Sequence, residues 1–326
     1  MTAFPGRRGV VYLISALLIV AILLAIMYAR TLPTGEERSR SVVTRIQAMS
    51  DFLSDFHGDV PRATYIAGFR SLIAIEQYTS QEGVYVTNAT PLFIEAFMNG
   101  TVDGQPYDIL TNSTFGDYLG RVNDEARQQG IALNVTVQDI ALNQSTPWSI
   151  DVSFLMTVNV TDTRGLARWD YQKWFTTEVS ILDLRDPAYS VSTDGKLPNT
   201  IRESPYNNSD LVTGNNTANL DDEIQQGYYR EDPYAPSYLQ RLQGDLNGTS
   251  KYGIASIINL DDLNAQGLPV YTDRSTVDAY YFSGRNATLY CPTEGSPLPS
   301  WFKLDATHYD DPAHDYGLSK LNATIC

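Results

Sequence analysis

The sequence predicts an α+β fold: an N-terminal transmembrane helix, helices packed on an antiparallel β-sheet, and a smaller mixed C-terminal region. Three observations lead to this expectation. An uncharged apolar run lies near the start of the chain, apolar residues at helical spacing follow it, and the spacing then changes to a period of two. Weaker helix and strand signals return after residue 237.

The apolar run over residues 9–29 predicts a membrane-spanning helix. Its residues carry no charge, and at about 1.5 Å of rise per residue they span roughly 30 Å, the thickness of the hydrocarbon core of a bilayer. A cleaved secretory signal usually has a shorter run and a small-x-small cleavage site, of which residues 26–29 are a poor version. We therefore expect an uncleaved anchor in contact with membrane lipid, after a cytosolic tail of residues 1–8.

Helical spacing resumes after a break at Pro33 and Gly35, where Thr34 and Glu37 form a capping box. The first helix carries apolar residues over two heptads, and they form one narrow seam: Val42, Ile46, Met49, Leu53 and Phe56. The seam can pack on the helix's own globular domain or on another subunit. We favour the first, because two heptads are short for a coiled coil.

Three more helices are expected ahead of the sheet. Gly58 ends the first helix, and Pro61 opens a second one that includes residues 65–78. A Thr-Pro pair is typical of the first turn of a short helix over residues 90–97. A fourth helix is expected over residues 114–129, because a glycine follows it directly.

The apolar period changes from helical to two after residue 130. Every second residue is apolar in one long segment: Trp148, Ile150, Val152, Phe154, Met156, Val158 and Val160. Shorter segments of the same kind lie around residues 133–137 and 171–181. The pattern predicts an antiparallel sheet with one core face, covered by the helices, and one solvent face. Residues 30–196 would then form one extracytosolic helix-plus-sheet domain.

The remainder of the chain divides into two parts. Residues 197–236 are rich in Asn, Asp, Gly, Ser, Thr, Tyr and Pro without sustained periodicity, so we expect a linker or a surface excursion. Residues 237–326 are expected to form a mixed C-terminal subdomain. Its signals indicate helices near residues 238–242 and 254–263 and a strand around residues 277–282.

Eleven of the eighteen asparagines lie in the tripeptide Asn-X-Ser/Thr, the acceptor for N-glycosylation. Ser and Thr make up 53 of 326 residues, so chance would place roughly three asparagines in this context. The eleven are Asn88, Asn99, Asn112, Asn134, Asn143, Asn159, Asn207, Asn215, Asn247, Asn286 and Asn322. They all follow the apolar run, so we expect a cytoplasmic N-terminus and an extracellular C-terminal domain. The flanking arginines are nearly balanced and do not decide this orientation.

The two cysteines, Cys291 and Cys326, both lie in the part expected outside the cell. In an oxidising compartment we expect them to pair and to close a loop that contributes about 3–4 kcal/mol. The alternative is two free buried thiols. The net charge of −15 argues against nucleic acid as a partner, because the chain lacks a basic patch in sequence that could neutralise phosphates.

Residues that could carry chemistry are few. Residues 308–315 combine two histidines with carboxylates, which could bind zinc or calcium. Their spacing matches no known metal-binding loop, and a proline implies a turn, so we favour a polar surface turn and expect no metal, cofactor or catalytic site. Ser300 with His308 and Asp305 could be imagined as a triad, but sequence neighbours rarely form one. We interpret His57 as structural.

The start of the chain resembles a known signal. Arg7, Arg8 and Gly9, followed directly by the apolar run from Val10, resemble the class III signal of type IV pilins and archaellins. The resemblance implies cleavage between Gly9 and Val10, with the apolar helix kept on the mature protein to pack in a filament core or to anchor the subunit. Ile14 stands at the fifth apolar position, where bacterial pilins commonly have glutamate.

Three further segments look like those of uncharacterised archaeal envelope proteins with pilin-like anchors: residues 185–189, 234–239 and 298–305. This resemblance implies an envelope location and brings no known activity. The function expected is a membrane-anchored, N-glycosylated structural or interaction protein, either an accessory pilin or pseudopilus subunit or an envelope subunit, with other such subunits as partners. A surface adhesin or glycan-binding module is the alternative, since tyrosines can stack on sugars, and an extracellular hydrolase is the third reading.

Overall fold

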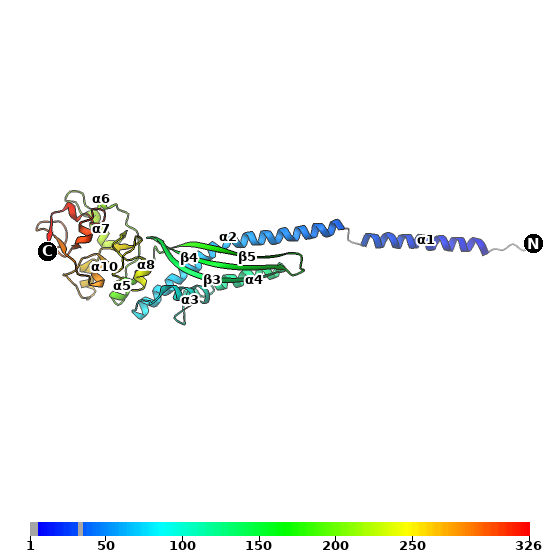
Figure 1. Cartoon of the computed structure of the whole chain (residues 1–326), viewed down its shortest axis with the longest axis horizontal. Helices are drawn as coiled ribbons and strands as arrows, with labels where there is room; N and C mark the ends of the chain where they lie inside the picture. Colours follow the sequence, from blue (N-terminus) through cyan, green and yellow to red (C-terminus); the bar gives the residue numbers. More distant parts are fainter. Residues whose placement is uncertain (1–5, 32–34) are drawn as a thin grey trace, which may run out of the picture.

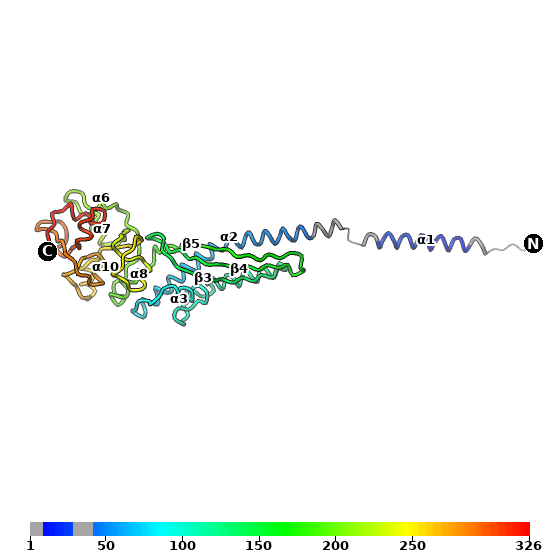
Figure 2. Tube along the Cα trace, in the orientation of Figure 1, coloured from blue at the N-terminus to red at the C-terminus, as the bar shows by residue number. Residues whose placement is uncertain are grey.

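The computed structural model describes residues 6–31 and 35–326 and has an elongated shape (Figure 1). A separate N-terminal helix lies at one end of the long axis, the helix-plus-sheet part lies in the middle, and a region of short elements lies at the other end. Figure 2 shows the same order along the Cα trace. The break expected at Pro33 and the cap expected at Thr34 lie outside the described residues.

Helix α1 (Gly6–Thr31) contains the expected membrane segment. Its stretch Gly9–Tyr28 is long and apolar enough to cross a membrane, and none of it is buried against the rest of the chain. Large apolar side chains such as Leu13, which is 65% exposed, cover its surface. A helix with this surface needs an apolar environment, which a bilayer or neighbouring apolar helices can supply.

Helix α2 (Gly35–Glu82) is one continuous helix, so the end expected at Gly58 is wrong. Pro61 lies inside it, and the helix expected to start there is the second half of α2. Proline removes one helical hydrogen bond, but the neighbouring side chains of Phe56 and Val60 are buried and hold this turn against the rest of the domain. In Figure 1 the two halves of α2 run in different directions, as a proline bend produces.

The heptad seam of α2 packs on the chain's own domain, as its short length predicts. Three of its five residues are buried: Met49, Leu53 and Phe56. Ile46, one turn before Met49, is 39% exposed. An ion pair adds a polar contact near this point, because Arg45 Nε donates to Asp162 Oδ1 at 2.7 Å. The seam is therefore an intramolecular contact from Met49 onward.

Two further helices lie beside α2, as the sequence predicts. Helix α3 (Ala89–Asn99) begins just before the expected Thr90, because the side chain of Asn88 accepts the backbone N–H of Thr90 and caps the helix. Helix α4 (Phe115–Gln128) begins after Thr114, which forms a capping box. A short hairpin and a 3-10 turn join the two helices: β1 (Thr101–Val102), β2 (Gln105–Pro106) and η1 (Asp108–Leu110).

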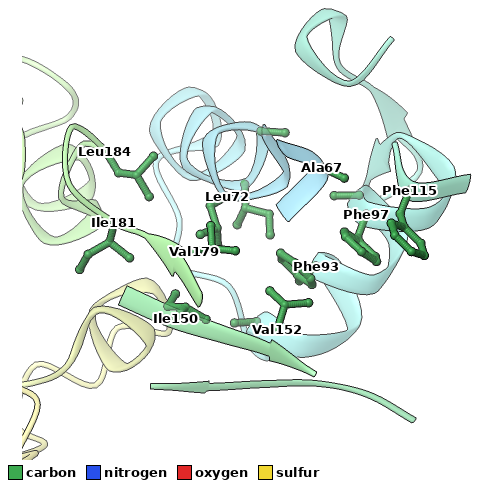
Figure 3. Close-up of a cluster of buried hydrophobic side chains, with 14 of the residues drawn as sticks. Ala67, Leu72, Phe93, Phe97, Phe115, Ile150, Val152, Val179, Ile181 and Leu184 are labelled. Carbon is green, nitrogen blue, oxygen red and sulfur yellow. The ribbon is translucent and has the colours of Figure 1, made fainter. Parts of the chain in front are cut away.

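Three long antiparallel strands form the main sheet: β3 (Ile131–Thr146), β4 (Ser149–Asp162) and β5 (Arg168–Ser180). Strand β4 is central, and alternate side chains along it are fully buried, which confirms the predicted core face: Ile150, Val152, Phe154, Met156, Val158 and Val160. Figure 3 shows Leu72 of α2 and Phe93 of α3 next to Val152 and Val179 of the sheet. The rings of Phe115 and Phe154 are 5.2 Å apart and join α4 to the same core.

The C-terminal region consists of short elements joined by turns. They are α5 (Pro187–Ser192), α6 (Asn208–Leu211), α7 (Ala218–Gln226), β6 (Tyr229–Glu231), α8 (Tyr238–Leu242), β7 (Ile254–Ser256), α9 (Leu260–Ala265), α10 (Asp278–Ser283), β8 (Leu289–Pro292), β9 (Leu304–Asp305), α11 (Ala306–Tyr309), η2 (Leu318–Lys320) and β10 (Ala323–Ile325). β6 pairs with β7, and β8 lies between β10 and β9, all antiparallel. The helix expected over residues 238–242 is α8.

Residues 197–236 differ from the linker or surface excursion that their composition suggests. They contribute fully buried apolar side chains to the C-terminal region: Ile201, Leu211, Val212, Leu220 and Tyr229. These residues have no regular spacing, because each comes from a different short element or turn. Polar residues between them occupy the turns, and the segment therefore belongs to the packed region.

Two other elements of the C-terminal region differ from expectation. The strand expected over residues 277–282 is replaced by helix α10, which spans Asp278–Ser283. Gly284 with φ 66° is its C-cap, and burial of Tyr280 and Tyr281 overrides their strand preference. The helix expected over residues 254–263 is strand β7 followed by α9, which starts after the capping side chain of Asn259. In such short elements the intrinsic helix and strand propensities of the residues are weak, so tertiary packing determines which conformation the segment adopts.

Cys291 and Cys326 form the expected disulfide. Cys291 lies in β8, next to the Thr324 position of β10, and the Cα atoms of the two cysteines are 5.4 Å apart. The bond closes a loop with a sequence separation of 35 residues. By restricting the unfolded chain, a loop of this size contributes about 3–4 kcal/mol to stability.

Removing the ring of Phe154 tests the packing of the sheet on the helices. Phe154 is fully buried, so Phe154→Ala should lower the free energy of unfolding by about 3–5 kcal/mol, as measured by urea denaturation. Trp174 on β5 is 58% exposed, and Trp174→Ala is the matched control, expected to change stability by about 0.5 kcal/mol or less. Equal losses in the two variants would contradict the assignment of the core face.

Candidate functional site

The eleven acceptor asparagines all lie where a glycan could be attached. Ten of their side chains are exposed and Asn159 is partly buried. Asn134 on β3 lies directly opposite Asn159 on β4, on the solvent face predicted for both. Asn143 belongs to the same face, because it lies opposite Asp151 of β4. Directly opposed side chains have Cβ atoms only about 5 Å apart, so glycans on Asn134 and Asn159 would touch.

Two acceptors lie at the ends of helix α3, and a third lies in the turn after η1. Asn88 is the N-cap of α3, and Asn99 is the last residue of the same helix. Asn112 follows the 3-10 turn η1 and adopts a left-handed backbone conformation with φ 56°, which asparagine tolerates better than most residues. Asn88 uses only its Oδ1 for the cap, so its side-chain nitrogen, to which a glycan would be attached, stays available.

A groove with a volume of about 830 Å³ lies between α2 and α4. Its apolar lining includes Phe52, Phe56, Ala63, Ile66, Tyr118 and Val122. Three arginines and three carboxylates also line it, namely Arg62, Arg70, Arg121, Asp55, Asp59 and Glu125. The formal charges of this set balance, so the groove combines apolar surface with hydrogen-bonding groups of both signs and favours no ion of either sign.

The C-terminal region contains a polar cluster around Arg241, whose side chain is fully buried. Its Nη1 donates to Asp186 Oδ2 at 2.6 Å and to Asp278 Oδ2 at 2.9 Å. Its Nη2 donates to Asp278 Oδ1 at 3.0 Å and to the carbonyl oxygen of Ile254. Asp186 caps α5, Asp278 begins α10, Ile254 belongs to β7, and Arg241 belongs to α8. One guanidinium thus joins four elements.

Two hydroxyl groups donate further hydrogen bonds to the two carboxylates of this cluster. The Tyr229 hydroxyl donates to Asp186 at 2.8 Å, and the Ser256 hydroxyl donates to Asp278 at 2.9 Å. Burial raises the pKa of Asp278, and the charge and hydrogen bonds of Arg241 act in the opposite direction. The carboxylate oxygens that face Arg241 are therefore engaged inside the protein, and the cluster serves to fix the fold.

A second polar cluster surrounds His308, which is also fully buried. Its Nδ1 lies 2.7 Å from Asp305 Oδ2, and its Nε2 lies 2.6 Å from Asp232 Oδ2. Two carboxylates can both accept only if both ring nitrogens carry protons, so the ring is an imidazolium. Burial alone would lower the pKa of His308, but the hydrogen bonds from the ring to Asp232 and Asp305 outweigh burial and raise the pKa to about 9.

The polar surface turn expected around His308 is therefore wrong for this residue. Its partner Asp232 lies far away in sequence, so the local pattern could not reveal the buried pair. With both ring nitrogens bonded, His308 has no free nitrogen to act as a base, and Ser300 is exposed while His308 is buried. Across residues 6–31 and 35–326, no group of three or more His, Cys, Asp and Glu side chains is placed to hold a metal ion.

The other two histidines each contact one polar side chain. His314 Nδ1 lies 3.0 Å from Asp311 Oδ2 near the protein surface. His57 lies inside α2, and its Nε2 is 2.6 Å from the Tyr171 hydroxyl of β5. Burial and the charge of Lys173 lower the pKa of His57, so the neutral ring links the helix to the sheet.

Comparisons with known proteins identify no relative of this chain. No family model, no curated protein and no solved structure matches the chain. The resemblance to pilins and to archaeal envelope proteins therefore stays a prediction from the sequence. The function has to be inferred from the apolar helix, the acceptor asparagines, the groove and the two polar clusters.

Removing the charge of Arg241 tests the first polar cluster. Arg241→Met leaves two buried carboxylates without their cation, so we expect a loss of about 3–5 kcal/mol in the free energy of unfolding. Arg127 pairs with Asp124 on the exposed surface, and Arg127→Met should change stability by about 0.5 kcal/mol or less. Urea denaturation measures both. Equal stability of the two variants would exclude a central role for this cluster.

The His308 cluster predicts a dependence of stability on pH. The folded-state pKa of about 9 is above the ordinary 6.5, so the protonated ring contributes about 3 kcal/mol. This contribution is fully present below about pH 6.5 and is lost as the pH rises through about 9. Melting temperatures between pH 6 and pH 10 should fall for the wild type. His308→Gln should remove this part of the fall and His314→Gln should keep it, whereas equal profiles for all three would refute the assignment.

Proposed function

We propose that this chain is a single-pass, N-glycosylated membrane protein that carries its folded part outside the cell, as a structural or interaction subunit of the envelope. The observation that carries the proposal is α1. Its stretch Gly9–Tyr28 is apolar, long enough to cross a bilayer and free of packing against the rest of the chain. Such a surface is stable when lipid or other apolar helices cover it.

Two observations support an extracellular location for the folded part. The disulfide between Cys291 and Cys326 is the kind of bond that persists in oxidising compartments. The acceptor asparagines are spread over the solvent-facing surface of both the sheet and the C-terminal region, where a glycan can be accommodated without unfolding. Both features would be expected if everything after α1 lies on the far side of the membrane.

The arrangement of α1, α2 and the sheet supports an accessory pilin-like subunit as the more specific role. A long helix leaves the apolar segment and packs its later part on an antiparallel sheet, while the apolar segment remains free. The basic pair and Gly9 lie at the start of α1, directly before the apolar surface. This arrangement would let a processed subunit keep its helix for the membrane or for a filament core.

Analysis of the amino terminus of the mature protein tests this role. We expect full-length protein to remain in the membrane fraction after alkaline carbonate extraction and its mature chain to begin at Val10, by intact mass. Gly9→Leu should block the cleavage and leave the protein in the membrane, because the apolar surface of α1 is kept. A mature chain that begins at Met1 or Thr2 would count against the pilin-like role and leave the anchor intact. Recovery in the soluble fraction would refute the anchor.

A further inference from the structure

The groove between α2 and α4 contains one of the acceptor asparagines. Asn112 is among its lining residues, and its side chain is exposed. Arg121, another lining residue, donates from Nη1 to the backbone carbonyl oxygen of Asn112 at 3.1 Å, which fixes the acceptor turn against α4. A sugar attached to Asn112 would therefore begin inside the groove.

The groove also contains the hydroxyl of Tyr118, which makes no well-formed hydrogen bond within the described part of the chain. Tyr118 is 7% exposed and lines the groove. Asp59 is the nearby acceptor, since burial and then the charge and a hydrogen bond of its carboxylate raise the pKa of Tyr118, but the contact between the two side chains is too poorly aligned to count as a full hydrogen bond. A buried hydroxyl whose hydrogen bond is poorly aligned costs up to about 1–3 kcal/mol, and a sugar hydroxyl that reaches it from the groove would lower this cost.

The charge balance of the lining selects among ligand classes. Three arginines and three carboxylates give no net attraction for an anion or a cation. Neutral sugars carry many hydroxyls that can both accept from arginine and donate to carboxylate, and their apolar faces can pack on Phe52 and Tyr118. The volume of about 830 Å³ lies within the range of ligand pockets, roughly 300–1,000 Å³.

We infer that the groove between α2 and α4 is the docking site of the chain's own N-linked glycan on Asn112. The inference rests on the proposed glycosylation and deepens it by assigning one glycan a fixed position. The covalent link keeps the sugar at high effective concentration, so weak contacts suffice to hold it. The glycan would cover the exposed apolar side of α2, including Ile66, which is 42% exposed, and would offer the hydroxyl of Tyr118 a better aligned partner than Asp59.

Hydrogen exchange with matched variants tests the inference on full-length glycosylated protein in detergent. Asn112→Gly and Asn112→Asp both remove the acceptor, and both residues tolerate φ 56°. We expect amide exchange in residues 52–70 and 112–129 to become about tenfold faster in both variants. Asn215→Asp removes an exposed acceptor in the C-terminal region and should leave these segments unchanged.

A second variant separates docking from attachment. Tyr118→Phe keeps the acceptor and removes the hydroxyl, so glycopeptide mass spectrometry should show Asn112 still occupied while exchange in the groove becomes faster. Unchanged exchange in the Asn112 variants, with Asn112 occupied in the wild type, would overturn the inference. Protection that grows with protein concentration would assign the groove to a second copy of the chain and also overturn it.

Occupancy distinguishes failure of this inference from failure of the proposed function. If Asn112 is bare while other acceptors carry glycans, the docked glycan is refuted and the glycoprotein proposal stands. If all eleven acceptors are bare in the native host, the glycoprotein part of the proposed function fails together with the inference. Membrane extraction and the mature amino terminus remain independent tests of the anchor.

Discussion

The buried guanidinium of Arg241 is the constraint on which the C-terminal region depends. A charge without water must be surrounded by acceptors, so Asp186 and Asp278 have to meet at the same point. The elements that carry these residues are too short to be stable alone: α5 and α10 have six residues each, and α8 has five. Tertiary contacts, polar and apolar, therefore determine which backbone conformation each segment adopts. The same elements reach the rest of the molecule, since the N–H of Val86 donates to the carbonyl oxygen of Leu242 in α8 at 3.1 Å.

The helix-plus-sheet part has a regular apolar pattern and the C-terminal region does not, and this difference explains which features the sequence could predict. In β4 the period of two is imposed by one buried face, so alternation alone identified the strand and its core residues. The glycine after residue 129 likewise indicated the end of α4, whose start the structure shows to be fixed by a capping box at Thr114. Gly58 and Pro61 led to the wrong prediction of a helix end, because residues that usually break a helix can be accommodated when the flanking turns are buried. Two heptads were enough to identify the seam of α2.

The apolar residues of the C-terminal region have no regular spacing from which elements could be predicted. The partners of its buried charges are far apart in sequence: Arg241 meets Asp278, and His308 meets Asp232. These charged side chains can lie in the interior because each is bonded to a partner of opposite charge. The cysteines were the exception, since two of them in one compartment have only one intramolecular pairing. For the surface, the tripeptides gave the acceptor positions, but only the coordinates show that Asn112 lines a groove and that Asn143 joins Asn134 on the sheet face.

The continuity of α2 has a mechanical consequence. In Figure 1 the strands of the main sheet run alongside α2, from the Arg45–Asp162 ion pair to the Gly68 contact with Val152 and Val179, and the C-terminal region lies at the end of the sheet away from α1. A pull between the α1 end and the far end of the molecule would thus act roughly along the strands, and it would load the packing of α2 on the sheet in shear. A packed surface loaded in shear shares the force over many contacts, whereas a surface that is peeled apart loses them one at a time.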